Sequence, residues 1–247
     1  MYAQEQIKPY CEKKSKREQV EQMFDNIAHS YDVLNHTLSF GIDRYWRNCA
    51  IKCLKKSGKA TRRILDIATG TGDFALLACR ELNPDKVVGC DISDNMMRIG
   101  EEKVAEAGLS EKICFRKEDC SAMSFSDGSF DAVITAFALR NFENLDRCLQ
   151  EMRRVIVSGG IVVAVDLCAP VSFPMKQLFY FYKKAVMPMV GCLFSHDGNA
   201  YTYLPETMDA VPQAAAMQEI FEKAGFVNVH YKRLAFGMCI LYVAEKM

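Results

Sequence analysis

The sequence predicts an α/β protein built on a doubly wound, seven-stranded, mostly parallel sheet with an antiparallel C-terminal hairpin and helical lid segments. Three observations support this fold class. From Ile64 onward, apolar runs with strand character alternate with amphipathic stretches, which is typical of a parallel sheet covered by helices on both faces. A turn containing two glycines, residues 66–73, separates the first apolar run from a helical pattern. The last two apolar runs are separated by only a few residues.

The individual elements follow from apolar runs bounded by Asn, Asp and Gly. The predicted strands are Arg63–Ile67, Lys86–Asp91, Ile113–Arg116, Ala132–Ala136, Ile161–Asp166, Val229–Arg233 and Met238–Ala244. The predicted helices between them are Phe74–Glu81, Asp94–Ala107, Leu145–Val155 and Gln213–Ala224. Gly108 and Gly159 are expected to end the elements that precede them.

The connection between the last two strands decides how they pair. Only Leu234–Gly237 separates them, which is too short for a helical crossover, so we expect an antiparallel hairpin. Sheets that bind nicotinamide cofactors usually lack such a hairpin. It therefore favours the methyltransferase version of the doubly wound fold.

Two segments lie outside the alternation of strands and helices. One is a helical N-terminal segment, residues 16–56, and the other is an insertion at residues 172–212 after the fifth strand. We expect both to belong to a single domain spanning residues 1–247. Because open α/β sheets bind ligands at the carboxyl ends of their strands, we expect the two segments to form a lid there.

Composition limits the function and the location of the protein. The 247 residues include 31 basic and 31 acidic side chains, so no net charge attracts nucleic acid or anionic lipid. The eleven cysteines form no CxxC pair, which indicates neither a disulfide framework nor a metal site. The first residues lack the pattern of a secretion signal, and no run of 18 uncharged apolar residues occurs. We expect a cytoplasmic protein, either free or peripherally attached to the membrane.

The glycine turn and the next strand end predict a nucleotide site. Gly70 and Gly72 let the backbone turn tightly and approach a ligand, and the first N–H groups of the following helix remain free. Asp91 ends the second predicted strand, where a carboxylate can accept hydrogen bonds from both ribose hydroxyls. Its distance of about 20 residues from the glycines suits a cofactor that contains adenosine.

The identity of this cofactor depends on Asp66. The stretch Gly70–Ala75 also fits the GxGxxG/A pattern of dinucleotide-binding proteins, so an NAD-linked oxidoreductase is an alternative. At the end of the first strand, the Asp66 carboxylate would repel a pyrophosphate but attract the ammonium or sulfonium of S-adenosylmethionine (SAM). We therefore predict SAM. In a simpler alternative, Asp66 only caps a helix.

Residues 31–46, Tyr-Asp-Val-Leu-Asn-His-Thr-Leu-Ser-Phe-Gly-Ile-Asp-Arg-Tyr-Trp, are the most specific stretch. They closely resemble the N-terminal signature of the ubiquinone/menaquinone biosynthesis C-methyltransferase family. Further matching motifs follow in the family's order and extend to about residue 245: residues 66–73, Asp91, residues 119–125, residues 137–141 and residues 201–206. The chain departs from the family at residues 154–160, where Val-Ser replaces the usual Lys-Pro before two glycines, and at Asp43 and Ala136, where many relatives carry His and Ser.

This resemblance implies a class I methyltransferase with a Rossmann-like fold and SAM as its cofactor. Thr71, Asp91, Asp119 and Cys120 would contact the cofactor, with Asp119 and Cys120 beside the adenine. Asp119 follows the third strand, at the height expected for an acceptor of the adenine amino group. Without the resemblance, it reads equally well as a surface acid in a turn.

The implied reaction is the C-methylation of a polyprenyl quinol, from demethylmenaquinol to menaquinol. A 2-methoxy-6-polyprenyl-1,4-benzoquinol substrate is an alternative, and a protein that binds SAM without catalysis is another. A phenol with a pKa of about 10 is only about 0.1% ionised at neutral pH, a handicap of roughly 4 kcal/mol. Arg140 would stabilise the phenolate, and Asn141 would orient the same oxygen. The candidate proton acceptors are His29, Asp43, His196 and Asp197.

Residues 173–194 are rich in aromatic side chains and methionine, but they also contain three lysines and two prolines. That mixture rules against a membrane-spanning helix. It predicts an apolar wall for an isoprenoid tail, or a shallow membrane contact with the lysines toward the headgroups. Ordinary core packing is the alternative. The sequence predicts no oligomeric state.

Overall fold

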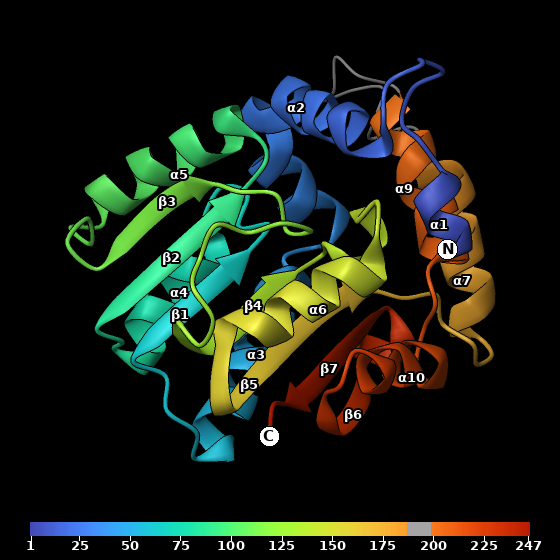
Figure 1. Cartoon of the computed structure of the whole chain (residues 1–247). Helices are drawn as coiled ribbons and strands as arrows, with labels where there is room; N and C mark the ends of the chain where they lie inside the picture. Colours follow the sequence, from blue (N-terminus) through green and yellow to red (C-terminus); the bar gives the residue numbers. More distant parts are fainter. Residues whose placement is uncertain (187–198) are drawn as a thin grey trace.

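The computed structural model describes residues 1–186 and 199–247. Figure 1 shows one twisted sheet with helices on both faces and more helices gathered beyond one end of the strands. The strands are β1 Arg63–Ile67, β2 Lys86–Asp91, β3 Ile113–Lys117, β4 Phe130–Ala136, β5 Ile156–Leu167, β6 Val227–Leu234 and β7 Cys239–Glu245.

The sheet confirms the predicted fold class. Its strand order is β3-β2-β1-β4-β5-β7-β6. Strands β1 to β5 pair in parallel, whereas β7 runs antiparallel to both β5 and β6, so the predicted C-terminal hairpin is present. The strand order reverses between β1 and β4, and the crevice beyond their carboxyl ends is where such sheets bind ligands.

The helices of the alternating part lie where the sequence predicts them, to within two residues. They are α4 Asp73–Leu82, α5 Asp94–Glu106, α6 Leu145–Val155 and α10 Ala215–Lys223. Short polar side chains fix two of their starts, because the Ser93 and Asn144 side chains accept hydrogen bonds from backbone N–H groups in the first turns of α5 and α6.

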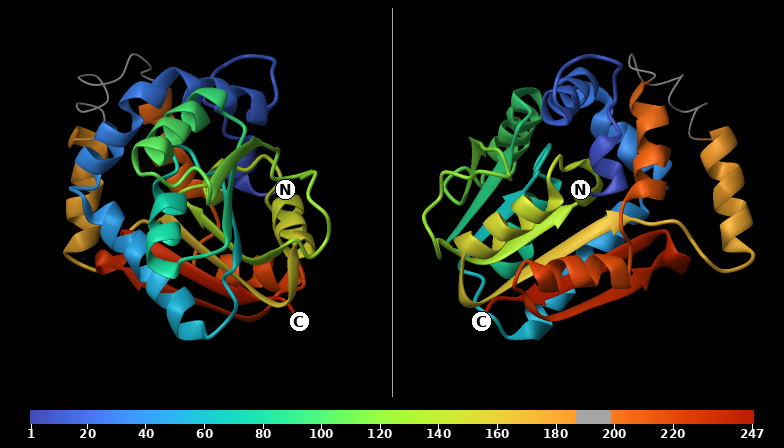
Figure 2. Two further views of the ribbon diagram at one scale, coloured as in Figure 1. Left: turned by 90° about the vertical axis from the view of Figure 1, so that its left-hand side faces the viewer. Right: turned by 45° about the vertical axis from the view of Figure 1, so that its right-hand side comes forward.

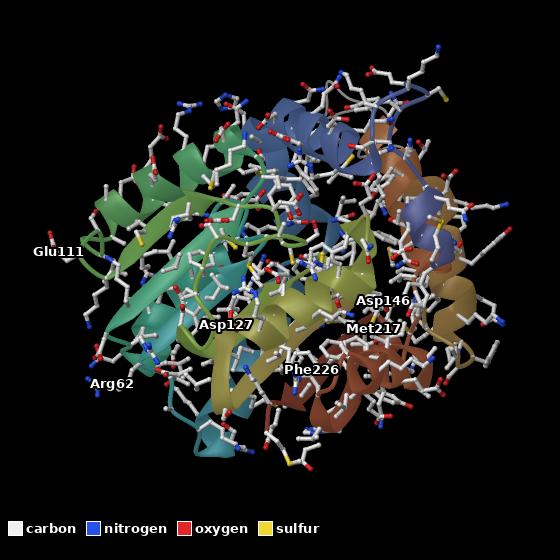
Figure 3. All side chains as sticks on the ribbon, in the orientation of Figure 1. Arg62, Glu111, Asp127, Asp146, Met217 and Phe226 are labelled. Carbon is white, nitrogen blue, oxygen red and sulfur yellow. The ribbon has the colours of Figure 1, made fainter. Side chains whose placement is uncertain are left out.

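Successive side chains of the central strands supply two cores on opposite faces of the sheet. On β1, Leu65 packs into the core beneath α6 and α10, which also contains Met217 and Phe226, both labelled in Figure 3. Ile64 packs into the other core with α4 and with α3 Ile42–Ser57, which contributes Trp46. Both faces of the sheet are therefore covered, and only its ends remain for a ligand.

Strand β5 begins five residues earlier than predicted. It follows α6 directly, and the pairing with β4 shifts between Phe130–Ile156 and Ala132–Ile161, so residues 157–160 form an irregular stretch within the strand. Gly159, expected to end the preceding element, has a φ of 81° in this stretch. Gly159 and Gly160 therefore form a kink within β5 and do not end an element.

Gly160→Ala should destabilise the fold by about 1–3 kcal/mol, because no space exists for a methyl group. A Cβ there would lie 2.2 Å from Cγ2 of Ile156 and 2.7 Å from the carbonyl oxygen of Asp131. Urea unfolding measures the change, with the exposed neighbour Ser158→Ala as the control. Equal unfolding midpoints for Gly160→Ala and the unsubstituted protein would show that the kink can accommodate a methyl group at this position.

Several helices cover the carboxyl ends of the strands (Figures 1 and 2). They are α1 Ala3–Gln6, α2 Lys16–Leu38, the 3-10 turn η1 Leu139–Asn141, α7 Met175–Phe181, the π-helical turn η2 Tyr182–Val186 and α9 Asn199–Ala210. Within the part of the chain that the structure describes, no helix is long and apolar enough to cross a membrane.

The cover is held to the sheet domain by both apolar and polar contacts. Met23 and Ile27 of α2 share a buried cluster with Met96 of α5 and Tyr203 of α9. At the N-terminus, the hydroxyl of Tyr2 donates a 2.7 Å hydrogen bond to Asp146 at the start of α6, labelled in Figure 3. The predicted N-terminal segment thus divides in two: α2 lies over the strand ends, whereas α3 packs on a face of the sheet.

Candidate functional site

A cavity of about 910 Å³, including its opening to solvent, lies beyond the carboxyl ends of β1, β2 and β4. We call it the loop cavity because the glycine turn after β1 forms part of its wall. Four of the predicted cofactor residues border it: Gly70, Asp91, Asp119 and Cys120. The cover closes it on the other side with Arg17, Val20, Phe24 and Tyr31 of α2.

Different structural constraints favour glycine at the two positions of the turn, Gly70 and Gly72. Both have positive φ, 55° at Gly70 and 77° at Gly72, which disfavours any side chain. Gly70 borders the cavity, and a Cβ there would lie 4.0 Å from the ring of Tyr31. Gly72 lies away from the cavity, and a Cβ there would lie 2.8 Å from the ring of Phe115. Gly72 thus serves the packing of the helix start against β3.

Asp66 lies beneath the turn and does not border the loop cavity. Its carboxylate accepts a 2.7 Å hydrogen bond from the hydroxyl of Thr69, and the residue is 1% exposed. Burial raises its pKa to about 7, and the bond from Thr69 only partly opposes this rise. Asp66 therefore supports the turn from below through Thr69. It does not line the cavity, where we expected it to attract a cationic cofactor directly.

Thr71 is also turned away from the cavity. Its hydroxyl donates a 2.6 Å hydrogen bond to Asp32 of α2, and the side chain is buried. Lys103 of α5 lies 3.0 Å from the same Asp32 carboxylate and also pairs with Asp73. The Thr71 side chain therefore links the glycine turn to α2. It does not face the cavity, where we predicted a contact with the cofactor.

Asp91 borders the loop cavity at the end of β2. Its two carboxylate oxygens accept backbone hydrogen bonds, one from Gly70 at 2.8 Å and one from Ser93 at 2.9 Å. These bonds hold the carboxylate at the cavity wall and tend to lower its pKa, but burial outweighs them and raises it. Since a carboxylate offers about four acceptor positions, about two remain for ligand hydroxyls.

The end of the cavity beside β3 combines polar and apolar walls. Asp119 accepts hydrogen bonds from the backbone N–H and the hydroxyl of Ser121, at 2.8 and 2.7 Å, which fixes its orientation. Cys120 is buried beside it, and burial raises the pKa of its thiol well above the usual value. The cavity wall also contains apolar side chains that sequence reasoning missed, among them Ile92, Met96 and Phe142.

The charge of the loop cavity favours a cation. Four carboxylates border it, those of Asp91, Glu118, Asp119 and Glu143, against one basic side chain, Arg17. Arg17 itself lies 3.5 Å from the Asp119 carboxylate, so this acid neutralises its charge. A sulfonium would be attracted into such a cavity, whereas a pyrophosphate would be repelled.

Arg140 is buried and already paired, which changes its predicted role. Its Nη1 lies 2.5 Å from the carboxylate of Asp166 and 2.6 Å from the carbonyl oxygen of Phe137. Its Nε is buried and has no hydrogen-bond partner among the described residues. Much of the guanidinium charge that the sequence analysis assigned to a phenolate is thus balanced by Asp166, and the Nε–H remains free to donate.

Asn141 lies next to Arg140 and is only half engaged. Its Nδ2 donates to the carbonyl oxygen of Phe137 at 3.3 Å, and its buried Oδ1 has no partner within the described part of the chain. Phe137, at the end of β4, has a φ of 63°, a strained value for a residue with a side chain. The chain therefore turns sharply out of β4 into η1, which forms part of the cover.

Two further cavities lie near the loop cavity and share wall residues with their neighbours. The bridging cavity, about 510 Å³, lies between α2, η1 and α9, and it shares Phe24, Tyr31 and Asn141 with the loop cavity. Arg140, Asn35, Tyr203 and apolar side chains complete its wall.

The apolar cavity, about 980 Å³, lies between the end of α2, the start of α3, α7, η2 and α9. It shares Asn35, Leu38 and Leu204 with the bridging cavity. The other walls are almost entirely apolar, with contributions from Phe40, Trp46, Leu178, Phe179 and Met208. Through these shared residues the bridging cavity adjoins both the acidic loop cavity and the apolar cavity.

Of the two candidate proton acceptors that the structure describes, His29 and Asp43, only Asp43 borders one of these cavities. His29 is exposed on α2 and borders none of the three cavities. Asp43 lines the apolar cavity, but it is 2.5 Å from Nη1 of Arg47 and also accepts bonds from Ser39 and His36. Burial tends to raise the pKa of Asp43, yet these partners together lower it, so it is a poor base. His196 and Asp197 lie outside the described residues.

Comparison with known proteins identifies relatives along the whole chain. The model of the ubiE/COQ5 methyltransferase family matches residues 12–246. A demethylmenaquinone methyltransferase of Bacteroides fragilis is 54% identical over 245 residues, 99% of each chain. One of Porphyromonas gingivalis is 44% identical over 247 residues, 100% of each chain. A solved SAM-dependent methyltransferase of Thermotoga maritima shares the fold, with a TM-score of 0.62 at 16% identity over 92% of this chain and 99% of that one.

Proposed function

This chain belongs to the ubiE/COQ5 methyltransferase family, and from that membership and its three neighbouring cavities we propose that it methylates a ring carbon of demethylmenaquinol to give menaquinol. The observation that carries the proposal is the neighbourhood of these cavities. An acidic cavity suited to a cationic donor and an apolar cavity each share wall residues with the smaller bridging cavity, which contains Arg140 and Asn141.

SAM fits the residues of the loop cavity. The free acceptor positions of Asp91 would hold the ribose hydroxyls, Asp119 would accept from the adenine amino group, and Ile92 and Cys120 would contact the adenine faces. The backbone at Gly70 would allow close approach of the rest of the molecule. When bound, SAM supplies an electrophilic methyl group carried on a sulfonium.

The bridging cavity is the proposed place of the quinol ring, because it adjoins the loop cavity and contains Arg140 and Asn141. The free Nε–H of Arg140 would donate to the ring oxygen as negative charge develops on it. The Oδ1 of Asn141 would accept the hydrogen of the same hydroxyl and orient it. Together they would make the neighbouring ring carbon a better nucleophile at neutral pH.

The apolar cavity is the proposed place of the first units of the prenyl tail. Its wall combines Leu, Met and aromatic side chains from several elements, which suits a flexible hydrocarbon. Four large apolar side chains of this region are exposed to solvent: Phe40 and Leu178, which border the cavity, and Phe173 and Phe181, which lie next to and on α7. These four side chains are called the apolar rim below.

We further propose that the apolar rim touches the surface of the bilayer that contains the substrate. Two exposed lysines, Lys176 and Lys184, lie on the same segment as most of the rim and can face anionic headgroups. A tail of several isoprene units could then enter the apolar cavity directly from the lipid.

Replacing Phe173 and Phe181 together by Ser should reduce binding to anionic vesicles at least about tenfold, because each ring contributes roughly 1.5–3 kcal/mol when it leaves water. Sedimentation with phosphatidylglycerol-containing vesicles measures the bound fraction. Tyr231→Ser, which removes a half-exposed ring from β6, is the matched control. Equal binding of the unsubstituted protein and both variants would contradict a contact between the apolar rim and the bilayer.

The proposed substrate is tested by comparing two chemically reduced quinols in one assay. Demethylmenaquinol and 2-methoxy-6-polyprenyl-1,4-benzoquinol with equal prenyl tails are supplied with SAM, and kcat/KM is measured for each. We expect efficient methylation of the naphthoquinol. A clear preference for the benzoquinol would move the function to the alternative substrate, and turnover of neither would contradict the proposal.

A further inference from the structure

Four buried polar atoms without partners lie around the bridging cavity. Eight such side-chain atoms occur in the described part of the chain, and four belong to residues that border this one cavity. They are Nδ2 of Asn35, Nε of Arg140, Oδ1 of Asn141 and the hydroxyl of Tyr203. A buried polar atom without a partner destabilises a protein, so a cluster of them indicates a ligand that supplies the partners.

Two of these residues have no role in the reaction described above. Tyr203 is 3% exposed and lies on α9, and Asn35 lies on α2, so both belong to the cover rather than to the sheet. Arg140 lies close enough to Tyr203 for its charge to oppose the rise in the pKa of the Tyr203 hydroxyl, but burial outweighs this effect and the pKa stays raised. Arg140 and the Asn35 side chain act in the same direction on the pKa of Tyr31, another residue of the cavity wall, and burial again outweighs them.

The hydrogen-bonding character of the cluster defines its ligand. Nδ2 of Asn35 and Nε of Arg140 can only donate, Oδ1 of Asn141 can only accept, and the Tyr203 hydroxyl can do both. The remaining wall is apolar apart from Tyr31. A flat apolar molecule with two hydroxyl groups, each able to donate and to accept, matches this set.

We propose that Tyr203 and Asn35 bind the quinol head group through hydrogen bonds to its hydroxyl oxygens, and that they thereby position the ring beside Arg140 and Asn141. This inference rests on the proposed function and extends it. The head-group site is completed only when α2 and α9 of the cover lie together, since each contributes one of the two residues. They are positioning residues, whereas Arg140 and Asn141 act on the reacting oxygen.

The test uses 1,4-naphthohydroquinone, a diol without a tail, titrated calorimetrically under anaerobic reducing conditions into protein saturated with S-adenosylhomocysteine. Tyr203→Phe removes only the hydroxyl and should weaken binding of the diol at least tenfold. Asn35→Leu should do the same. The affinity for S-adenosylhomocysteine should change less than about threefold in both, and Tyr231→Phe on β6 should leave both affinities unchanged.

Thermal unfolding without ligand separates this role from a structural one. Because Tyr203→Phe removes a buried hydroxyl that has no partner, its Tm should equal or exceed that of the unsubstituted protein. Unchanged affinity for the diol, no binding of the diol by the unsubstituted protein, or a loss of affinity together with a fall in Tm would each overturn the proposal. Failure of the proposed function is read separately, as absence of methylation of demethylmenaquinol.

Discussion

Arg140→Lys should lower kcat roughly a hundredfold or more while changing the affinity for SAM less than about threefold. The lysine keeps a positive charge beside Asp166, but it loses the guanidinium fork and with it the unpaired Nε–H of a residue that borders the bridging cavity. Loss of one donor aimed at a developing oxyanion typically costs a factor of 10² to 10³ in kcat. Single-turnover methylation and calorimetric titration with SAM measure the two quantities.

The alanine variant of the same residue reports on stability as well. Arg140→Ala leaves the buried Asp166 carboxylate unpaired, which typically costs 3–5 kcal/mol, so a fall in activity alone would not separate chemistry from unfolding. The lysine variant should keep most of that stability and still lose turnover. Equal losses of turnover and of SAM affinity in Arg140→Lys would argue against a role at the quinol oxygen.

Asp91→Ala should weaken the binding of SAM and of S-adenosylhomocysteine roughly a hundredfold or more. The change removes the proposed acceptor of both ribose hydroxyls, and a hydrogen bond to a charged group is worth about 1.5–3 kcal/mol. It also leaves the backbone N–H of Gly70 without its partner and loosens the glycine turn. Turnover at saturating SAM should fall much less than affinity.

A matched control exists six residues upstream, at the start of β2. Asp85 is exposed and pairs with Arg62 at 2.7 Å on the surface, where an ion pair contributes little. Asp85→Ala should therefore bind SAM as the unsubstituted protein does. If Asp91→Ala kept its affinity as well, the ribose would have to lie elsewhere in the loop cavity.

The fold was predictable because its signals are local. Apolar runs of strand length, the Asn, Asp and Gly residues that bound them and a four-residue link between the last strands sufficed for the sheet and its hairpin. The start of β5 was missed because the same glycines, Gly159 and Gly160, can end an element or kink a strand. Only the pairing partners, β4 and β7, decide between these outcomes.

The site was less predictable because tertiary contacts decide which way its side chains point. Spacing alone located Asp91 and Gly70, but it could not show that Asp66 and Thr71 turn away from the cavity. Asp66 satisfies Thr69, three residues along the chain, whereas Thr71 meets Asp32 on a helix 39 residues earlier. No sequence period reports such a distant partner.

The reacting end of the site shows the same limit. Asp166, which pairs with Arg140, lies at the end of the neighbouring strand β5, 26 residues away in sequence. Tyr203 was part of a matching motif, but nothing in the sequence indicated that α9 brings its hydroxyl beside Arg140. A signal could have been found in the alignment of parallel strand ends, since residues that end β4 and β5 must lie side by side.

The most direct test of the central claim is to follow the methyl group itself. The protein is incubated with SAM carrying a trideuterated methyl group and with demethylmenaquinol, either chemically reduced or oxidised, and the lipid is analysed by mass spectrometry with fragmentation. We expect one trideuterated methyl group on a ring carbon of the lipid, and only when the reduced lipid is supplied. Label on an oxygen, label acquired equally by the oxidised lipid, or no label in the lipid while SAM is bound would contradict it.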